Sequence, residues 1–249
     1  MKYRKIIQGT FVSRPNRFIA NVDIEVNGKT VCEVVHVKNT GRCKELLIPG
    51  VKVYLEESDN PNRKTKYDLV TVYKSGIGLI NMDSQAPNKV VKEWLNNQNG
   101  NLKLFDNISY IKPEYTYGKS RIDFYFEYEN KKVLMEVKGV TLERDKVAYF
   151  PDAPTIRGVK HLDELAEAAK LGYECYIVFV IQMKGVDIVY PNIETHKEFG
   201  EALERAKKAS VNVLFLGCTV TEDELFIDRI NSCKSNIIKN CSRMEGKYE

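Results

Sequence analysis

The chain has 249 residues, 43% hydrophobic and 29% charged, which fits one large or two small soluble domains. It contains no apolar run long enough to cross a bilayer, no signal peptide and no CxxC pair among its six cysteines, so we expect a cytoplasmic protein with free thiols and no membrane partner. The net charge of +4 is uneven: residues 1–83 carry 14 Lys and Arg against 9 Asp and Glu, an excess that indicates a polyanionic partner.

A β-hairpin is predicted near the start of the chain. Hydrophobic residues alternate with mostly polar ones from Phe18 to Val26, and the dipeptide Asn27-Gly28, the strongest short hairpin signal, follows. With this turn, Phe18 pairs with Val37 on the return strand. The alternation predicts that the Phe18 side chain lies in the core.

Short strands dominate the whole of residues 1–83. Besides the hairpin, strands are expected at residues 6–12, 51–56, 68–73 and 77–81. Five or six short strands in about 80 residues indicate a small barrel, for which an oligonucleotide-binding (OB) fold and an SH3-like barrel are the two alternatives.

From residue 84 the pattern changes to alternating helices and strands. Helices are expected near residues 89–97, 157–173 and 195–209, and strands near 108–116, 121–128, 132–140, 175–181 and 211–217. This alternation predicts an α/β domain over residues 84–230. The polar segment 231–249 is expected to be a flexible tail.

Charged residues interrupt an otherwise apolar hairpin at residues 121–140. With a two-residue turn at Glu129-Asn130, Asp123 lies opposite Glu136, with Cβ atoms roughly 4.5–5.5 Å apart. A four-residue loop would instead place Asp123 opposite Lys138. Opposed carboxylates repel each other, and a divalent cation between them removes the repulsion. The pattern therefore predicts a metal site beside Lys138, the alternative being ordinary charge on a solvated strand face.

Several longer stretches resemble the sugar fermentation stimulation protein A family. They are SRPNRFIANV, HVKNTGRCKELLIPG, YGKSRIDF, MEVKGVTL, YFPDAPTIRGVKHLDEL and YIVFVIQM, between residues 13 and 183. Asp123 followed by the E-x-K stretch 136–138 is also similar to the core of the PD-(D/E)xK nuclease superfamily, with Ile122 in place of the usual proline. In the loop after the first hairpin, Lys38 stands where we expect proline and Cys43 where we expect an aliphatic residue.

The resemblance implies an N-terminal OB-fold barrel that binds nucleic acid, at residues 1–83, followed by a restriction-endonuclease-like PD-(D/E)xK α/β domain. It also implies that Asp123 and Glu136 bind Mg²⁺ or Mn²⁺. Lys138 matches the lysine that orients the attacking water and steadies phosphate charge. Many members add an acid from the preceding helix; Glu93 is our candidate for that metal ligand, and Glu114 competes for the role.

Basic residues supply candidate nucleic-acid contacts in both domains. Arg157, Lys160 and His161 cluster at the start of a predicted helix, where they either grip the scissile phosphate or form a basic helix end. Loop residues of the first domain that suit phosphate contacts are Arg14, Arg17, Asn39, Arg42, Lys44, Arg63 and Lys64. Asp152 is either an outer-shell acid or a turn former.

Aromatic side chains of the first domain are a second kind of candidate contact. Phe11, Phe18 and Tyr54 are candidate stacking surfaces for bases, although the alternation favours a core position for Phe18.

Two functions follow from these observations. The first is a DNA-binding, metal-dependent nuclease or phosphodiesterase, with RNA as the other substrate and with homodimers common among such nucleases. The second is a non-catalytic DNA-binding protein that regulates sugar metabolism with a nuclease-like fold. The sequence shows no helix-turn-helix signature, which counts against a conventional regulator.

Overall fold

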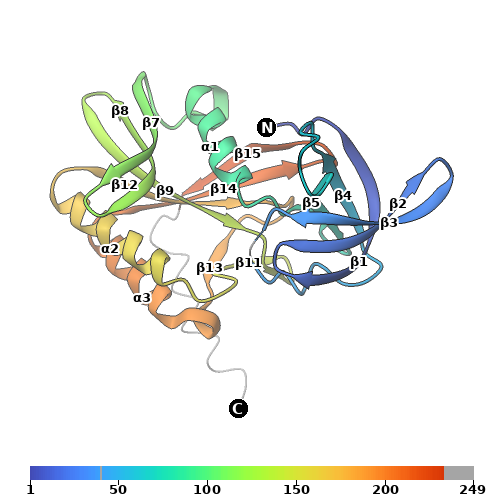
Figure 1. Ribbon diagram of the computed structural model, residues 1–249. Helices are drawn as coiled ribbons and strands as arrows, with labels where there is room; N and C mark the ends of the chain where they lie inside the picture. The colour runs from blue at the N-terminus through green and yellow to red at the C-terminus, as the bar shows by residue number, and fades with distance from the viewer. Residues whose placement is uncertain (40, 233–249) are drawn as a thin grey trace, which may run out of the picture.

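The computed structural model describes residues 1–39 and 41–232. Two domains follow each other along the chain, a strand-only domain and a larger domain in which helices cover a sheet (Figure 1). The last strand runs to Ser232, so residues 231 and 232 do not belong to the predicted tail; residues 233–249, the rest of that prediction, lie outside the described part. Within the described part, no helix has the length and apolar character needed to cross a membrane.

Six strands build the first domain. They are β1 (Ile6–Asn16), β2 (Ile19–Val26), β3 (Lys29–Val37), β4 (Lys52–Glu57), β5 (Tyr67–Lys74) and β6 (Gly78–Asn81). Neighbours pair in the order β3-β2-β1-β4-β5-β6, and a further parallel pairing joins β3 to β5. The pairings therefore form a closed circuit through β1, β2, β3, β5 and β4. Each of these five strands has a paired strand on both sides.

The predicted hairpin between β2 and β3 is confirmed. Asn27 and Gly28 form its turn with φ values of 52° and 74°, and the N–H of Val37 donates a 2.7 Å hydrogen bond to the carbonyl of Phe18. Positive φ at both central residues is what a tight two-residue turn requires, and Asn-Gly supplies it with little strain. The register that the turn dictates carries through to the far end of the hairpin.

The predicted core position of Phe18 is wrong. Its residue is 43% exposed, because it lies in the turn before β2, and the regular alternation begins only with the strand. The side chain of Asn16 accepts hydrogen bonds from the N–H groups of Phe18 and Ile19, which fixes this turn. The guanidinium of Arg17 covers the Phe18 ring at 4.6 Å.

A mixed six-stranded sheet is the centre of the second domain. Its strands are β7 (Ile108–Tyr117), β8 (Ser120–Tyr128), β9 (Lys131–Val140), β12 (Glu174–Ile181), β14 (Asn212–Val220) and β15 (Leu225–Ser232), in the order β15-β14-β12-β9-β8-β7. The inner strands β9, β12 and β14 are parallel, and the remaining pairings are antiparallel.

The second domain also has a small three-stranded sheet, made of β10 (Glu143–Arg144), β11 (Val147–Phe150) and β13 (Val189–Pro191). None of these three short strands, nor β15, was predicted from the sequence. A short 3-10 helix, η1 (Gly100–Leu102), lies between the first helix and β7.

Helices cover both faces of the large sheet. Helix α1 (Ala86–Asn96) lies on one face, and α2 (Ile156–Lys170) and α3 (Ile193–Lys208) lie together on the other (Figure 1). On the α1 side, Trp94 belongs to the same buried cluster as Phe126, and on the other side Leu165 belongs to the cluster that contains Ile177. The fold is thus a three-layer α/β/α arrangement with the sheet buried on both sides.

Buried polar groups join the two domains. The side-chain amide of Gln182, after β12, donates to the carbonyls of Asn81 (3.1 Å) and Asp83 (3.1 Å), and the N–H of Asn81 donates to the carbonyl of Gln182 (2.9 Å).

Lys38, which replaces the expected proline, forms an ion pair of 2.8 Å with the fully buried carboxylate of Asp83. Cys43 is buried, and burial raises the pKa of its thiol to about 12, so it acts as a small apolar residue.

Candidate metal and phosphate site

The hairpin that carries the acids has the predicted two-residue turn. Glu129 and Asn130 form it with φ values of 46° and 63°, and the register that follows pairs Phe124 with Met135. The regular pairing of β8 with β9 stops at that pair. One residue further, the Asp123 side chain replaces the backbone as the hydrogen-bond partner of β9: its Oδ2 accepts a 2.8 Å hydrogen bond from the N–H of Val137.

Asp123 is held from the α1 side of the sheet. Its Oδ1 accepts a 2.8 Å hydrogen bond from the side-chain amide of Asn88, in the first turn of α1. Burial raises the pKa of Asp123, and the nearby charge of Glu136 raises it further, against the hydrogen bonds from Val137 and Asn88. The charged form of Asp123 is therefore disfavoured, as expected for a buried acid beside a like charge.

Glu136 is held by a residue of α2, on the opposite side of the sheet from α1, and only one of its two carboxylate oxygens is engaged by the described residues. Its Oε1 accepts hydrogen bonds from the Lys138 ammonium, at 2.6 Å, and from Nδ1 of His161 on α2. Burial acts to raise the pKa of Glu136, but the His161 hydrogen bond and the Lys138 charge outweigh it and hold that pKa below its ordinary value. The residue is 2% exposed, and its Oε2 is buried without a partner among the described residues.

The tautomer of His161 follows from its two contacts. Its Nε2 accepts a 3.3 Å hydrogen bond from Nε of Arg157, so the ring proton is on Nδ1, where it is donated to Glu136. Arg157 itself is exposed. The third basic residue of this helix start, Lys160, points elsewhere: its ammonium bonds the carbonyl of Lys119 and pairs with Glu164.

The structure does not bring the predicted third acid to this site. Glu93 is exposed on α1 and forms a 2.7 Å ion pair with the N-terminal ammonium of Met1. The residue of α1 that reaches Asp123 is Asn88, which our sequence analysis missed because nothing in the local pattern distinguishes it. The competing Glu114 is exposed on β7 and lies 3.6 Å from Arg121.

The described residues fit a divalent cation held by two carboxylates. They contain no group of three or more His, Cys, Asp and Glu side chains arranged for a metal. Mg²⁺ binds through one or two carboxylates and completes its shell with water and substrate phosphate, so a larger group is not required. The buried, unpartnered Oε2 of Glu136 is the oxygen that such an ion would satisfy.

Three predicted phosphate contacts of the first domain are occupied by the protein itself. Arg14 donates four hydrogen bonds to the backbone carbonyls of Arg17, Asn39, Gly41 and Arg42. The side chain of Asn39 bonds the carbonyl of Met82 and the N–H of Gly41. Arg63 holds Asp68 through both of its terminal nitrogens, at 2.6 and 2.8 Å. These residues shape loops, and a phosphate would have to compete for their donors.

Other predicted contacts of this domain remain at the surface. Arg17, Arg42, Lys44 and Lys64 are exposed. Phe18 borders a cavity of about 410 Å³ that Lys38, Asn39 and Ser84 also line. The other two candidate stacking residues, Phe11 and Tyr54, are buried in the core.

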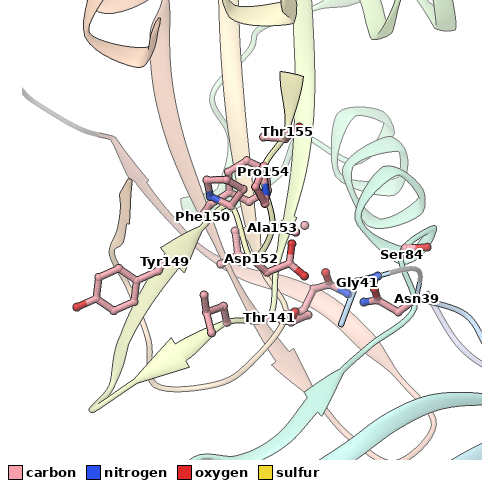
Figure 2. Close-up of a pocket in the computed structure, with 15 residues that line it drawn as sticks. Asn39, Gly41, Ser84, Thr141, Tyr149, Phe150, Asp152, Ala153, Pro154 and Thr155 are labelled. Atoms are coloured by element: carbon pink, nitrogen blue, oxygen red, sulfur yellow. Dashed lines mark hydrogen bonds between the residues drawn. The ribbon is translucent and has the colours of Figure 1, made fainter. Parts of the chain in front are cut away.

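A second cavity lies beside the acid site. It has a volume of about 310 Å³ and shares Asn39 and Ser84 with the cavity at Phe18. Gly139, which follows Lys138 on β9, lines it, and so do residues 149–155 before α2 (Figure 2). The two cavities therefore adjoin each other through these shared residues, and Gly139 brings the second one within one residue of Lys138 along β9.

An all-β domain followed by an α/β domain that carries a carboxylate pair and a lysine defines the class: a two-domain protein with a separate strand-built domain at its N-terminus. The family model described as "SfsA N-terminal OB domain" matches residues 12–82, and the family model described as "Sugar fermentation stimulation protein RE domain" matches residues 85–224. The chain belongs to the sugar fermentation stimulation protein family, which confirms the resemblance and, of the two small-barrel alternatives, the OB domain.

Relatives match over nearly their whole length. Two sugar fermentation stimulation protein homologs are 57% identical (Desulfitobacterium hafniense strain DSM 10664 / DCB-2, 90% of this chain and 94% of the relative) and 54% identical (Ruminiclostridium cellulolyticum, 92% and 97%). A solved structure of Pyrococcus furiosus SfsA in complex with Ca²⁺ superposes with a TM-score of 0.75 at 27% identity. It covers 94% of this chain and 95% of that chain.

Proposed function

We propose that this protein binds nucleic acid, DNA in the first instance, and hydrolyses phosphodiester bonds with Mg²⁺ or Mn²⁺ at Asp123 and Glu136. The observation that carries the proposal is the buried Oε2 of Glu136, which has no partner among the described residues. A buried carboxylate oxygen left unpaired is costly, and a cation removes that cost. In this proposal the second domain is a nuclease-like domain of the PD-(D/E)xK kind.

The similar solved structure supports a divalent cation. The Pyrococcus furiosus protein is in complex with Ca²⁺, and this hard cation shares the preference of Mg²⁺ and Mn²⁺ for oxygen ligands. Ca²⁺ commonly occupies sites of this kind because its size and flexible shell accept the same carboxylates. In this chain, Asp123 and Glu136 are the residues that would hold the ion.

The mechanism divides the work among the chain's own residues. When bound, the cation supplies an activated water and neutralises charge on the phosphate. Lys138 is 14% exposed at its side chain and is fixed by Glu136, so its ammonium is a preorganised positive group for the developing charge. His161 holds Glu136 in place by its hydrogen bond, as groups behind metal ligands do. Arg157, at the surface end of this series, is placed to meet a phosphate oxygen.

The first domain supplies the strand-binding surface in this proposal. Arg17 and Phe18 form an exposed cation–aromatic pair at the edge of the cavity of about 410 Å³. Exposed aromatic rings stack with bases, and exposed Lys and Arg side chains follow the phosphates. Lys44 and Lys64 are exposed basic residues of neighbouring loops.

Calorimetric titration with Mn²⁺ tests the proposal. The wild-type protein is expected to bind the ion, and Glu136→Gln and Asp123→Asn are expected to lose binding. Glu93→Gln is the matched control, because it removes an acid that the structure places elsewhere, and it should bind as the wild type does. Active protein should then cleave labelled single-stranded, duplex or branched DNA, or RNA, and Glu136→Gln should not. Metal binding that survives in Glu136→Gln would refute the assigned site.

A second candidate function is DNA binding without hydrolysis. The observation that favours it is that the described residues bring only two acids together, without the third acid predicted from α1. Binding that is unchanged by EDTA and falls linearly with log salt concentration, in a protein that cuts no substrate, would support this function.

A further inference from the structure

The cavity beside the acid site has walls from both domains. The loop after β3 contributes Asn39 and Gly41, and residues 139–142 at the end of β9 face the segment 149–155 (Figure 2). Its volume of about 310 Å³ lies at the lower end of the roughly 300–1,000 Å³ typical of ligand pockets, so it fits a single small planar group and not a base pair.

Asp152 is the charged group of this cavity. Its carboxylate is directed toward Gly41 (Figure 2), so closely that a Cβ atom at Gly41 would come within 2.4 Å of Oδ2. Asp152 makes no hydrogen bond and no ion pair within the described part of the chain. The hydroxyl of Thr141, which lines the same cavity, makes no hydrogen bond there either. The cavity therefore offers a carboxylate acceptor and a hydroxyl, neither of which has a hydrogen-bond partner among the described residues.

The charge of the lining excludes some ligands and favours others. Among the described residues that line the cavity there is no Lys or Arg, so a phosphate would meet only the repulsion of Asp152. Pro151, Pro154 and Phe150 supply apolar walls. A neutral, flat group with N–H donors on one edge satisfies both features.

We infer that this cavity binds one unpaired guanine of the nucleic-acid strand whose phosphate lies at Glu136 and Lys138. The inference rests on the proposed function, since it names the base that accompanies the phosphate. Gly139 connects the two places, because it lines the cavity and follows Lys138 directly. Enzymes that act on nucleic acid commonly read such an unstacked base by its Watson–Crick edge.

Guanine is the base that matches the two polar groups. Its ring N1–H and its exocyclic amine lie side by side, so both donate to the Asp152 carboxylate, as a bidentate pair. Its O6, next along the same edge, accepts from the Thr141 hydroxyl. Cytosine and adenine offer the carboxylate only an amine, and thymine and uracil offer one N–H between two carbonyls that the carboxylate repels.

Fluorescence anisotropy with labelled pentanucleotides TTGTT, TTATT, TTCTT and TTTTT tests the inference. EDTA is present, so that no strand is cut and the metal site does not contribute. The wild type is expected to bind TTGTT about tenfold more tightly than TTTTT, the ratio that one bidentate pair supplies. Asp152→Asn, which replaces an acceptor by a donor, should remove the preference.

Two further variants keep the test decisive. Gly41→Ala displaces the Asp152 carboxylate without changing its charge and should also weaken the preference. Asp163→Asn is the matched control: it removes an exposed acid that pairs with Arg205 on the surface, and the preference should persist. Melting temperatures confirm that each variant is folded.

The outcomes separate this inference from the proposed function. Equal affinity for the four pentanucleotides, or a guanine preference retained in Asp152→Asn, overturns the inference, while metal-dependent cleavage would still stand. A guanine preference in a protein that cleaves no substrate supports the inference and overturns hydrolysis. No binding of any pentanucleotide at low salt overturns both.

Discussion

His161 holds Glu136 by one carboxylate oxygen, the same oxygen that Lys138 contacts, and leaves the other oxygen buried and unpartnered in the described structure. This asymmetry distinguishes the site from a closed ion-pair network, in which each oxygen would have its own donor. The two donors fix the orientation of the carboxylate, and the remaining oxygen is available for a ligand.

Removing His161 should weaken metal binding without unfolding the protein. We expect His161→Ala to lower Mn²⁺ affinity by about 10–100-fold, the effect typical of groups that orient a metal ligand. His161→Gln, which retains a donor, should recover part of the loss. Lys160→Ala is the control, because Lys160 contacts Lys119 and Glu164 instead. Calorimetry measures all four proteins, and equal affinities would contradict the positioning role.

A bound cation should stabilise the fold through Glu136. At a free Mn²⁺ concentration of 100 times Kd, ligand linkage adds about 2.7 kcal/mol to the free energy of unfolding, which raises Tm by roughly 5–10 °C for a chain of this size. The rise should be absent in Glu136→Gln and reversed by EDTA in the wild type. Differential scanning calorimetry at fixed pH measures it; a similar rise in Glu136→Gln would place the ion elsewhere.

The Asp68–Arg63 pair predicts a loss of stability in acid. Burial acts to raise the pKa of Asp68, but the hydrogen bonds from Arg63 and His36 outweigh it, so the folded-state pKa is lowered. A group with a lowered folded pKa stabilises the protein above its unfolded pKa of about 3.9, and this contribution disappears as pH falls through the folded value.

Asp68→Asn should therefore lower the free energy of unfolding by about 1.5–3 kcal/mol at pH 7, because it removes charge-assisted hydrogen bonds. The difference from wild type should shrink below about pH 4. Urea unfolding at pH 7 and pH 3 measures it. Asp59→Asn, an exposed acid paired with Arg4 and Lys5, is the control and should change little at either pH. A difference that grows toward acid pH would refute the sign.

Two phenylalanines of the first domain should behave in opposite ways. Phe18 is exposed and Phe11 is 2% exposed. Phe18→Ala should cost about 1–3 kcal/mol in single-strand binding, as loss of a stacked base does, with no loss of stability. Phe11→Ala should cost about 3–5 kcal/mol in the free energy of unfolding. Anisotropy and urea unfolding on both variants measure the two effects, and unchanged strand binding in Phe18→Ala would remove Phe18 from the interface.

Local signals predicted the parts of the fold that local geometry decides. Asn27-Gly28 and Glu129-Asn130 each fixed a register, because a two-residue turn leaves no freedom in the pairing that follows. The pairing of Asp123 with the E-x-K strand followed from the second turn. The short strands of the small sheet had no such signal, since their pairing is decided by the segments they meet in space.

Glu93 shows why one site residue was misplaced. The acid belongs to the predicted helix, but the direction of its side chain depends on how α1 docks on the sheet. Asn88 faces Asp123, and at 3.6 residues per turn a residue five positions later points about 140° away around the helix. The helix predicted at residues 89–97 contains Glu93 and begins one residue after Asn88, whereas α1 contains both residues, and only its packing on the sheet decides which one faces the acids.

Through the contacts of Gln182 with Asn81 and Asp83, each domain supplies hydrogen-bond partners that water would otherwise have to supply to the other domain. The amides at this junction are buried and hydrogen-bonded to each other. A chain divided near residue 84 would therefore leave several of these polar groups without their partners. Fragment expression is therefore a poor route to study the two domains separately, and unfolding should proceed as one cooperative event. Redesign of this protein should therefore change surface loops and leave the contacts between the two domains intact.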